Sequence, residues 1–213
     1  HLKMKKDNSI IIGTGVIGGY LAKLLLSKRQ RVIVTSRKIK KSYTNYNKLN
    51  IENKVIFEEL DVLKKKDILK LLKKYTPKNI FYFSGQSSLT KSIKLKKTTN
   101  DSIYIGAKKF LEILHKYKLK TNFYKANSGY ILEPKKGLVN IKSKISKNKN
   151  PYILSQIKAY KEVKTFRKMG VNCCSVVFLQ VESPLRSNDF FIKKVCLHAK
   201  KKKKVIVGNI NTI

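Results

Sequence analysis

A glycine-rich stretch near the N-terminus, Gly13-Thr14-Gly15-Val16-Ile17-Gly18, follows the apolar run Ile10-Ile11-Ile12 and leads into apolar residues from Tyr20 to Leu26. A strand that ends in G-x-G-x-x-G and enters a helix leaves backbone N–H groups free to bind a dinucleotide pyrophosphate. In this motif the first glycine makes the tight turn, the second lets the backbone reach the phosphates, and the third lets helix and strand pack closely. We therefore expect a cofactor at Gly13, Gly15, Val16, Ile17 and Gly18, with an ordinary glycine turn as the alternative.

The end of the next expected strand bears on which dinucleotide binds. Residues 31–37 read Arg31-Val32-Ile33-Val34-Thr35-Ser36-Arg37. An NAD site would carry Asp or Glu at this end to hold the ribose 2′-hydroxyl. Two hydroxyls and the guanidinium of Arg37 suit a 2′-phosphate instead. We expect NADP as the cofactor and regard NAD as less favoured; the alternative is that Arg37 belongs to a lysine-rich surface.

Strand and helix patterns alternate along the rest of the chain. We expect further strands at 55–57, 78–83, 122–126 and 173–179, helices at 18–27, 67–74, 99–117 and 152–168, and a polar loop up to residue 53. This alternation predicts an α/β fold, a Rossmann-type doubly wound parallel sheet with its ligand at the carboxyl ends of the strands. We expect a dinucleotide-binding domain over residues 7–179 and the beginning of a smaller, truncated substrate-binding region over 180–213.

The composition narrows the class of protein. The 213 residues include 49 lysines and arginines against 12 acidic residues, for a net charge of +37, yet only five of the basic residues are arginine. Arginine and stacking aromatic residues would be enriched where phosphates and bases are recognised. We therefore expect no specific nucleic-acid partner, and a basic nucleic-acid-binding protein remains an alternative that rests on charge alone.

Cysteine usage and hydropathy bear on location. The three cysteines, Cys173, Cys174 and Cys196, are odd in number and have no metal-ligand spacing. This pattern is typical of reduced thiols, so we expect a cytoplasmic protein without a metal site. No apolar run approaches the length of a membrane span, and we expect no membrane association.

Segments at the ends of the later strands resemble the extended short-chain dehydrogenase/reductases. They are Phe83-Ser84-Gly85-Gln86-Ser87, Ala126-Asn127-Ser128-Gly129, Asn150-Pro151-Tyr152 and Glu182-Ser183-Pro184-Leu185-Arg186. The last segment, with Phe190 and Lys194, is similar to the GDP-mannose 4,6-dehydratase branch. The resemblance implies that hydride passes from the sugar C4 to NADP, that water is lost across C5 and C6, and that the hydride returns to C6. It also implies a nucleotide-sugar substrate, GDP-mannose, and a homo-oligomer if the protein is full length.

The resemblance implies four catalytic positions, of which two hold a matching side chain. Ser128 is expected to hydrogen-bond the reacting sugar oxygen, and Tyr152 to act as the acid/base at C4. Gln156 replaces the lysine that holds the nicotinamide ribose and lowers the pKa of the phenol. Tyr130 replaces the proton-abstracting glutamate, and Glu133 lies too far along the chain to match it. We therefore expect impaired turnover; a binding-only relative and a nucleotide-sugar epimerase or reductase are the alternatives.

The remaining contacts are also implied by the resemblance. Cofactor contacts are expected from Asp61, Val62, Ser84, Gly85, Gln86, Tyr152 and Gln156, and substrate contacts from Ser128, Gln180, Glu182 and Lys194. Asp61 is expected to contact adenine, or else to be an acid at a helix N-terminus. Lys194 could match by chance in a lysine-rich chain. Because the chain ends just after Gly208-Asn209, before the family's diphosphate-binding arginines, we expect it to be a piece of a longer reading frame.

Overall fold

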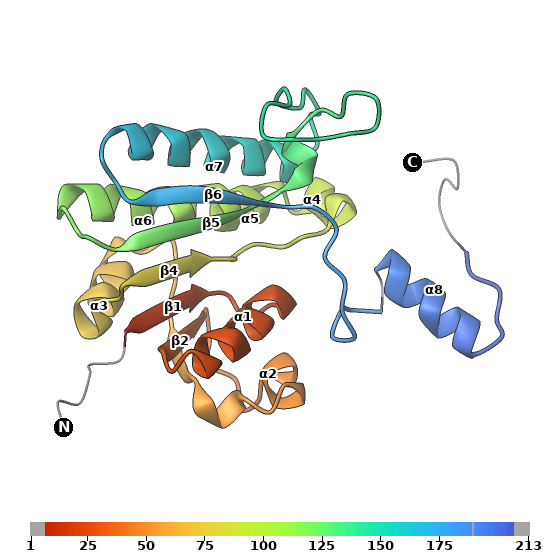
Figure 1. Ribbon diagram of the computed structural model, residues 1–213, viewed down its shortest axis with the longest axis horizontal. Coiled ribbons are helices and arrows are strands. Elements are labelled where there is room, and N and C mark those ends of the chain that lie inside the picture. The colour runs from red at the N-terminus through yellow and green to blue at the C-terminus, as the bar shows by residue number, and fades with distance from the viewer. Residues whose placement is uncertain (1–6, 189, 207–213) are drawn as a thin grey trace.

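A six-stranded parallel sheet organises the chain. The computed structural model describes residues 7–188 and 190–206. The strands are ordered β3-β2-β1-β4-β5-β6 (Figure 1), and every pairing is parallel. Their bounds are β1 (Asn8–Ile12), β2 (Arg31–Ser36), β3 (Ile56–Glu59), β4 (Asn79–Tyr82), β5 (Asn122–Ser128) and β6 (Cys173–Phe178). The order reverses at β1, which confirms the expected Rossmann-type doubly wound sheet.

Eight α-helices are described, most of them between successive strands. They are α1 (Val16–Ser27), α2 (Thr44–Lys48), α3 (Lys65–Tyr75), α4 (Leu89–Lys94), α5 (Lys96–Asn100), α6 (Gly106–Lys116), α7 (Pro151–Lys168) and α8 (Phe191–Lys200). A π-helical turn, Asp101–Ile105, joins α5 to α6, so the helix expected over 99–117 is interrupted in its hydrogen-bond pattern. Neither α2 nor α4 was expected from the sequence.

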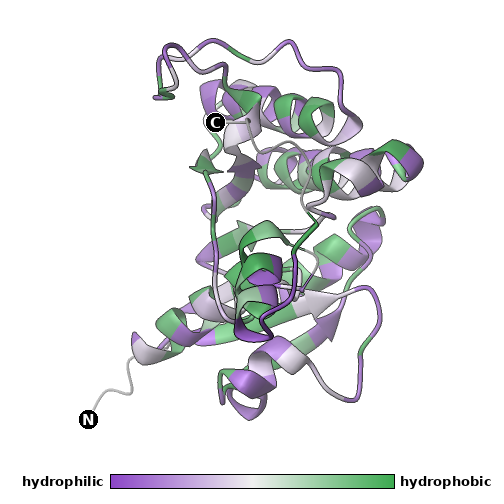
Figure 2. Ribbon diagram, turned by 90° about the vertical axis from the view of Figure 1, so that its right-hand side faces the viewer, coloured by the Kyte–Doolittle hydropathy of each residue, from purple (hydrophilic) through white to green (hydrophobic). Residues whose placement is uncertain are grey.

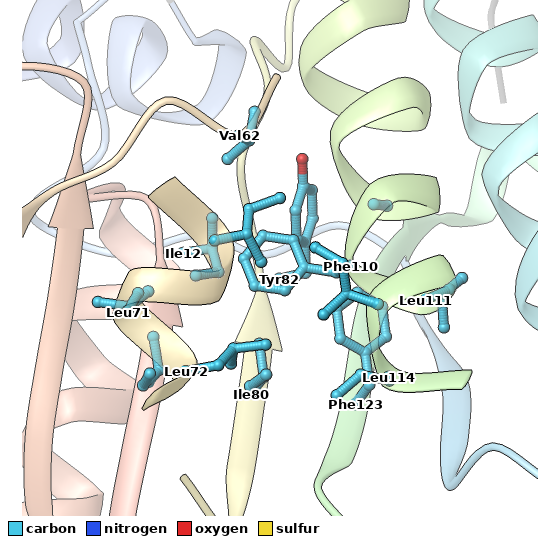
Figure 3. Packing of buried hydrophobic residues seen from close by; sticks show 14 of the residues in the cluster. Ile12, Val62, Leu71, Leu72, Ile80, Tyr82, Phe110, Leu111, Leu114 and Phe123 are labelled. Carbon is cyan, nitrogen blue, oxygen red and sulfur yellow. The ribbon is translucent and has the colours of Figure 1, made fainter. Parts of the chain in front are cut away.

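The two faces of the sheet have separate cores because side chains alternate along each strand. Ile10 and Ile12 point to the face covered by α3, α6 and α7, where they join a cluster that includes Phe110 and Phe123 (Figure 3). Ile11 points to the opposite face, where it packs with Val34 beneath α1 and α2. Burying one such aliphatic side chain contributes about 1.5–3 kcal/mol. Apolar and polar residues are interspersed along the helices (Figure 2), and in α3 and α6 the apolar residues are the ones that are buried.

The unexpected helix α2 is held by aromatic packing. Tyr43 and Tyr46 are buried, and the ring of Tyr43 stacks on that of Phe57 with centroids 4.0 Å apart. Tyr46 meets the same ring edge-on at 5.3 Å. Tyr43 is the N-cap residue of α2 and Tyr46 lies within the helix, so these contacts fix the start and the body of a short helix in the polar segment. The expectation of a loop up to residue 53 is wrong for this reason.

The chain leaves the sheet after β6. Helix α8 stands apart from the sheet (Figure 1), and none of its side chains is buried. Among the described residues, no helix combines the length and apolar character that crossing a membrane requires.

Candidate functional site

The glycine loop between β1 and α1 has an open helix N-terminus. Gly13 has a φ of +109°, which L side chains rarely adopt, and a Cβ on Gly18 would lie 3.1 Å from Cγ2 of Ile11. Gly15 is the N-cap of α1, no side chain caps it, and a Cβ there would meet no heavy atom of the described residues within 4 Å. The backbone thus makes a tight turn, a close helix–strand contact and an exposed, positively polarised helix end.

The end of β2 lies beside this loop, and the end of β3 follows it along the same edge of the sheet. The N–H of Gly13 donates to the carbonyl oxygen of Thr35 at 3.2 Å. Thr35 itself is only 2% exposed, so its hydroxyl does not reach the surface, whereas Arg37 is exposed. At the end of β3, Oδ1 of Asp61 accepts the N–H of Leu63 at 2.9 Å, and the side chain of Val62 is buried in the core. Arg37 and the backbone near Asp61 are therefore the groups that a ligand could reach here.

The segment after β4 brings a third strand end to the loop. A Cβ on Gly13 would lie 3.4 Å from the backbone nitrogen of Ser84, and Gly85 has a φ of +132°. The amide of Gln86 is engaged within the protein: Oε1 accepts the N–H of Ser88 at 2.7 Å and Nε2 donates to Oγ1 of Thr99 at 3.1 Å. Gln86 therefore shapes this segment, and its main chain is the part left to meet a cofactor.

The two matching catalytic positions lie at the end of β5 and the start of α7. Oγ of Ser128 accepts the N–H of Tyr130 at 3.3 Å and caps the 3₁₀ turn Gly129–Ile131. Oδ1 of Asn150 accepts the N–H of Tyr152 at 2.9 Å, which places the tyrosine in the first turn of α7. Tyr152 is 8% exposed and packs in a small cluster with Ile103 and Ile131. A capped helix start thus fixes the backbone of Tyr152.

The position expected to hold a base has no carboxylate. Tyr130 is 60% exposed. The nearest acid along the chain, Glu133, uses Oε1 to accept the N–H of Lys147 at 3.2 Å. A phenol is a poorer base than a carboxylate at neutral pH, where it keeps its proton. The structure therefore gives Glu133 a role in the loop after β5 and leaves Tyr130 as the side chain at this position.

Gln156 is buried and contacts a lysine that sequence reasoning missed. Oε1 of Gln156 accepts a hydrogen bond from Nδ2 of Asn127 at 3.2 Å and lies 3.5 Å from Nζ of Lys125. Lys125 is 1% exposed, and its ammonium also donates to the carbonyl oxygen of Ala126. Burial lowers the pKa of Lys125 to about 7. Lys125 lies two residues after the buried Phe123, on the same face of β5. This alternation is the sequence signal from which its burial could have been predicted.

The residues after β6 that are expected to contact the substrate are at least partly exposed. Gln180 and Glu182 are exposed, and the ammonium of Lys194 on α8 donates to the carbonyl oxygen of Ile206. The segment expected at Gly208-Asn209 lies outside the described residues. Within the part of the chain that the structure describes, no group of three His, Cys, Asp or Glu side chains could hold a metal ion.

Parallel strands end at one edge of the sheet, and the register brings the expected positions to that edge. Ile12 pairs with Thr35 and with Tyr82, and Tyr82 pairs with Lys125. The glycine loop, the segment after β4 and Ser128 therefore follow neighbouring strand ends, which is where ligands of doubly wound folds bind.

Known proteins with similar sequences are nucleotide-sugar dehydratases. The chain is 22% identical to GDP-mannose 4,6 dehydratase 2 of Caenorhabditis elegans, over 100% of this chain and 61% of that protein. It is 25% identical to GDP-mannose 4,6-dehydratase of Vibrio cholerae, over 90% of this chain and 54% of that protein. The chain thus spans little more than half the length of these relatives.

Solved structures share the fold. UDP-glucose 4-epimerase of Thermotoga maritima, solved with UDP-glucose, has a TM-score of 0.78 at 18% identity, covering 95% of this chain and 66% of that one. The dTDP-glucose 4,6-dehydratase of Streptomyces venezuelae, solved with NAD, also has a TM-score of 0.78, at 15% identity over 92% and 62% of the two chains. The family model for GDP-mannose 4,6 dehydratase matches residues 10–213. This chain belongs to the GDP-mannose 4,6 dehydratase family.

Proposed function

We propose that this chain is part of an NADP-dependent nucleotide-sugar dehydratase that acts on GDP-mannose and turns over slowly. The observation that carries the proposal is the convergence of an open helix N-terminus, Ser128 and Tyr152 at one edge of a doubly wound sheet. Family membership supports the substrate class. The free thiols of Cys173, Cys174 and Cys196 fit a reducing, cytoplasmic setting, and we keep a homo-oligomer as the expected state of the full-length protein.

The described residues fit a dinucleotide. Because a Cβ on Gly15 would meet nothing within 4 Å, the first turn of α1 leaves room for a pyrophosphate against its N–H groups. Arg37 would pair with a 2′-phosphate, and the backbone at Asp61 and Val62 would lie beside the adenine. The backbone of Ser84, Gly85 and Gln86 would line the path toward the nicotinamide. Bound NADP would supply the hydride acceptor for oxidation at the sugar C4.

The side chains of this chain suit some steps of the proposed dehydratase reaction better than others. Tyr152 would take the proton of the sugar 4-hydroxyl as C4 becomes a ketone, while Ser128 holds that oxygen. The ketone makes the neighbouring C5 proton acidic, and a base must remove it before the C6 hydroxyl leaves as water. Tyr130 is the side chain at this base position, and a phenol is a weak base near neutral pH. Loss of water is therefore the step that we expect to limit turnover.

A nucleotide-sugar epimerase or reductase is the second candidate. Both reactions need hydride transfer and an acid/base at C4 but no base at C5, so Tyr130 favours them over elimination. Two of the fold relatives, from Thermotoga maritima and Thermus thermophilus, are UDP-glucose 4-epimerases. A binding-only relative is the third candidate. Here Ser128 and Tyr152 would bind a nucleotide sugar without converting it.

One assay separates these candidates. The full-length protein is incubated with NADP or NAD and with GDP-mannose, UDP-glucose or dTDP-glucose, and products are identified by mass spectrometry and sugar analysis. A 4-keto-6-deoxy sugar, lighter by one water, from GDP-mannose with NADP supports the proposal. A 4-epimer of unchanged mass supports the epimerase instead. Cofactor binding by calorimetry without any product supports the binding-only protein, and the absence of binding to either cofactor overturns the proposal.

A further inference from the structure

Lys125 is a buried lysine that forms no ion pair with an acidic side chain of the described residues. Its side chain is 1% exposed, and no ion pair among the described residues includes it. Its polar contacts in the described part of the chain are neutral oxygens, the carbonyl of Ala126 and Oε1 of Gln156, and its Nζ lies 5.6 Å from the ring centroid of Tyr82. A buried charge with only neutral partners is costly. Groups of this kind cluster at functional sites, where the cost serves binding or chemistry.

The contact with Gln156 connects Lys125 to α7, the helix that carries Tyr152. Gln156 follows Tyr152 by four residues in α7, so the two side chains leave the helix on nearly the same face. Oε1 of Gln156 faces both Lys125 and Asn127. The amide oxygen is therefore occupied by protein donors, and the two N–H groups of Nε2 are the end of the side chain left to donate to a ligand.

A second observation indicates that a hydrogen-bond donor is missing next to Gln156. Oδ1 of Asn127 is buried and has no hydrogen-bond partner among the described residues, and Asn127 is 3% exposed. Its Nδ2 is already used, donating to the backbone oxygen of Gln156 at 2.9 Å. An unpaired buried acceptor next to a fixed amide suits a ligand that both donates and accepts, as a ribose hydroxyl does.

We propose that Lys125 supplies, from strand β5, the positive charge that α7 lacks at residue 156, and that it acts through Gln156 to position the nicotinamide ribose next to Tyr152. This inference rests on the proposed function, since it assumes a dinucleotide at the glycine loop. The ammonium polarises the amide whose oxygen it faces, which strengthens the N–H donors at the other end. Lys125 is therefore a positioning residue rather than a catalytic one.

Burial makes the charge of Lys125 depend on pH, so its positioning role belongs to the protonated side chain, which predominates below about pH 7. The lowered pKa, about 7, is caused by desolvation alone. The titratable side chain that contacts Lys125 from β4 is Tyr82, whose hydroxyl donates to the carbonyl oxygen of Ser102 at 2.7 Å. Tyr152 faces the same side of α7 as Gln156. No Asp, Glu or His among the described residues forms an ion pair with Lys125, so a developing negative charge in the site would be its counter-charge.

The test exchanges the side chains of residues 125 and 156. Four full-length proteins are compared: wild type, Lys125→Gln, Gln156→Lys and the double variant that carries both changes. The dissociation constants for NADP and NAD are measured by calorimetry, together with kcat and KM where turnover is found. Thermal unfolding of each protein serves as the folding control. Lys158→Gln is the matched variant, because Lys158 is an exposed lysine of the same helix whose Nζ lies 5.9 Å from the ring centroid of Tyr104.

We expect Lys125→Gln to weaken cofactor binding by about tenfold or more, as the loss of a charge-assisted hydrogen bond does. Gln156→Lys places a second ammonium beside Lys125 and should also bind weakly, because the two charges repel. The double variant restores one lysine and one glutamine to the pair and should recover affinity to within about threefold of wild type. Lys158→Gln should bind like wild type.

Three results would overturn the inference. A folded Lys125→Gln protein that binds the cofactor as tightly as wild type removes the role of Lys125 and leaves the proposed function intact. Failure of the double variant to recover, although both single variants fold, excludes action through residue 156. Wild type that binds neither cofactor overturns the proposed function and this inference together. If Lys125→Gln does not fold, Lys125→Met takes its place, because methionine fills a similar volume without a buried polar group.

Discussion

The side-chain oxygen of Asn150 accepts the backbone N–H of Tyr152 at 2.9 Å, so the residue that caps α7 also fixes the position of the tyrosine. The same oxygen accepts a hydrogen bond from Oγ of Ser92 at 3.0 Å, and Nδ2 donates to the carbonyl oxygen of Leu89 at 3.3 Å. Asn150 thus joins α7 to α4. A single side chain serves helix initiation, interhelical packing and the placement of a candidate catalytic group.

Replacing Asn150 should therefore affect stability and turnover together. We expect Asn150→Ala to lower the free energy of unfolding by about 1–2 kcal/mol through loss of the cap. It should also reduce the turnover attributed to Tyr152. Asn150→Asp keeps the cap acceptor and should retain most of the stability. Urea unfolding and product formation measure the two effects; equal stability of the alanine and aspartate variants would contradict the capping role.

Alanine substitutions at two glycines of the loop, Gly15 and Gly18, should differ in their effects on stability and on cofactor binding. A Cβ on Gly18 would lie 3.1 Å from Cγ2 of Ile11 and 3.2 Å from the carbonyl oxygen of Gly13. Gly18→Ala should therefore push α1 from β1 and destabilise the protein by about 1–3 kcal/mol. Gly15→Ala meets no atom in the free protein, so it should cost less than about 1 kcal/mol while weakening dinucleotide binding. Thermal unfolding and cofactor titration test the pair, and a Gly15→Ala protein with unchanged affinity would contradict the phosphate site.

The choice between NADP and NAD should depend on Arg37. Arg37 is exposed at the end of β2, where a guanidinium could pair with a 2′-phosphate. We expect Arg37→Ala to weaken NADP binding by about tenfold and to leave NAD binding unchanged. Lys38→Ala, the neighbouring exposed residue, is the control for general loss of positive charge. If both substitutions weaken NADP binding equally, Arg37 has no specific role.

Lys125 should make stability depend on pH in a defined direction. Its pKa falls from 10.5 to about 7 on folding, so the unfolded chain binds its proton more readily than the folded protein does. As the pH falls from 10.5 to about 7, the unfolded state gains a proton that the folded state lacks, and stability decreases by up to about 5 kcal/mol. Below about pH 7 both states are protonated and this contribution becomes constant.

The variant Lys125→Met isolates that effect. It should be more stable than wild type by about 1–4 kcal/mol at pH 7, because an apolar side chain replaces a buried charge. The difference should shrink toward zero as the pH approaches 10.5, the ordinary lysine value. Denaturant unfolding of both proteins at several pH values measures it. A pH-independent difference would show that Lys125 does not titrate between these limits.

The sheet could be predicted because its signal is repeated and local. Each strand contains a short run of β-branched or aromatic residues, and the glycine loop fixes the first strand–helix junction. Helix α2 could not be predicted, because Thr44-Asn45-Tyr46-Asn47-Lys48 has low intrinsic helix propensity and the helix depends on Tyr46 packing against Phe57. The strand β3 begins at Ile56 rather than at residue 55, a shift of the size usual for element ends.

For the candidate site, sequence reasoning identified residues but not their partners. Gln86 is held by Thr99, and Glu133 by Lys147, both through contacts that only the folded chain brings together. Lys125 was not among the expected site residues because lysine is common throughout this chain, although its alternation with Phe123 along β5 marks it as facing inward. Which of the expected residues contact a ligand stays a prediction.

The all-parallel register has a consequence for how the chain reaches its native state. Ser9 of β1 lies next to Asn79 of β4, seventy residues along the chain, and their side chains share a hydrogen bond. Parallel neighbours cannot be joined by a tight hairpin, so the central pairing forms only after a large loop has closed. Topologies dominated by such distant contacts fold slowly. We expect refolding in which the β1–β4 seam is among the last parts to gain protection from amide hydrogen exchange.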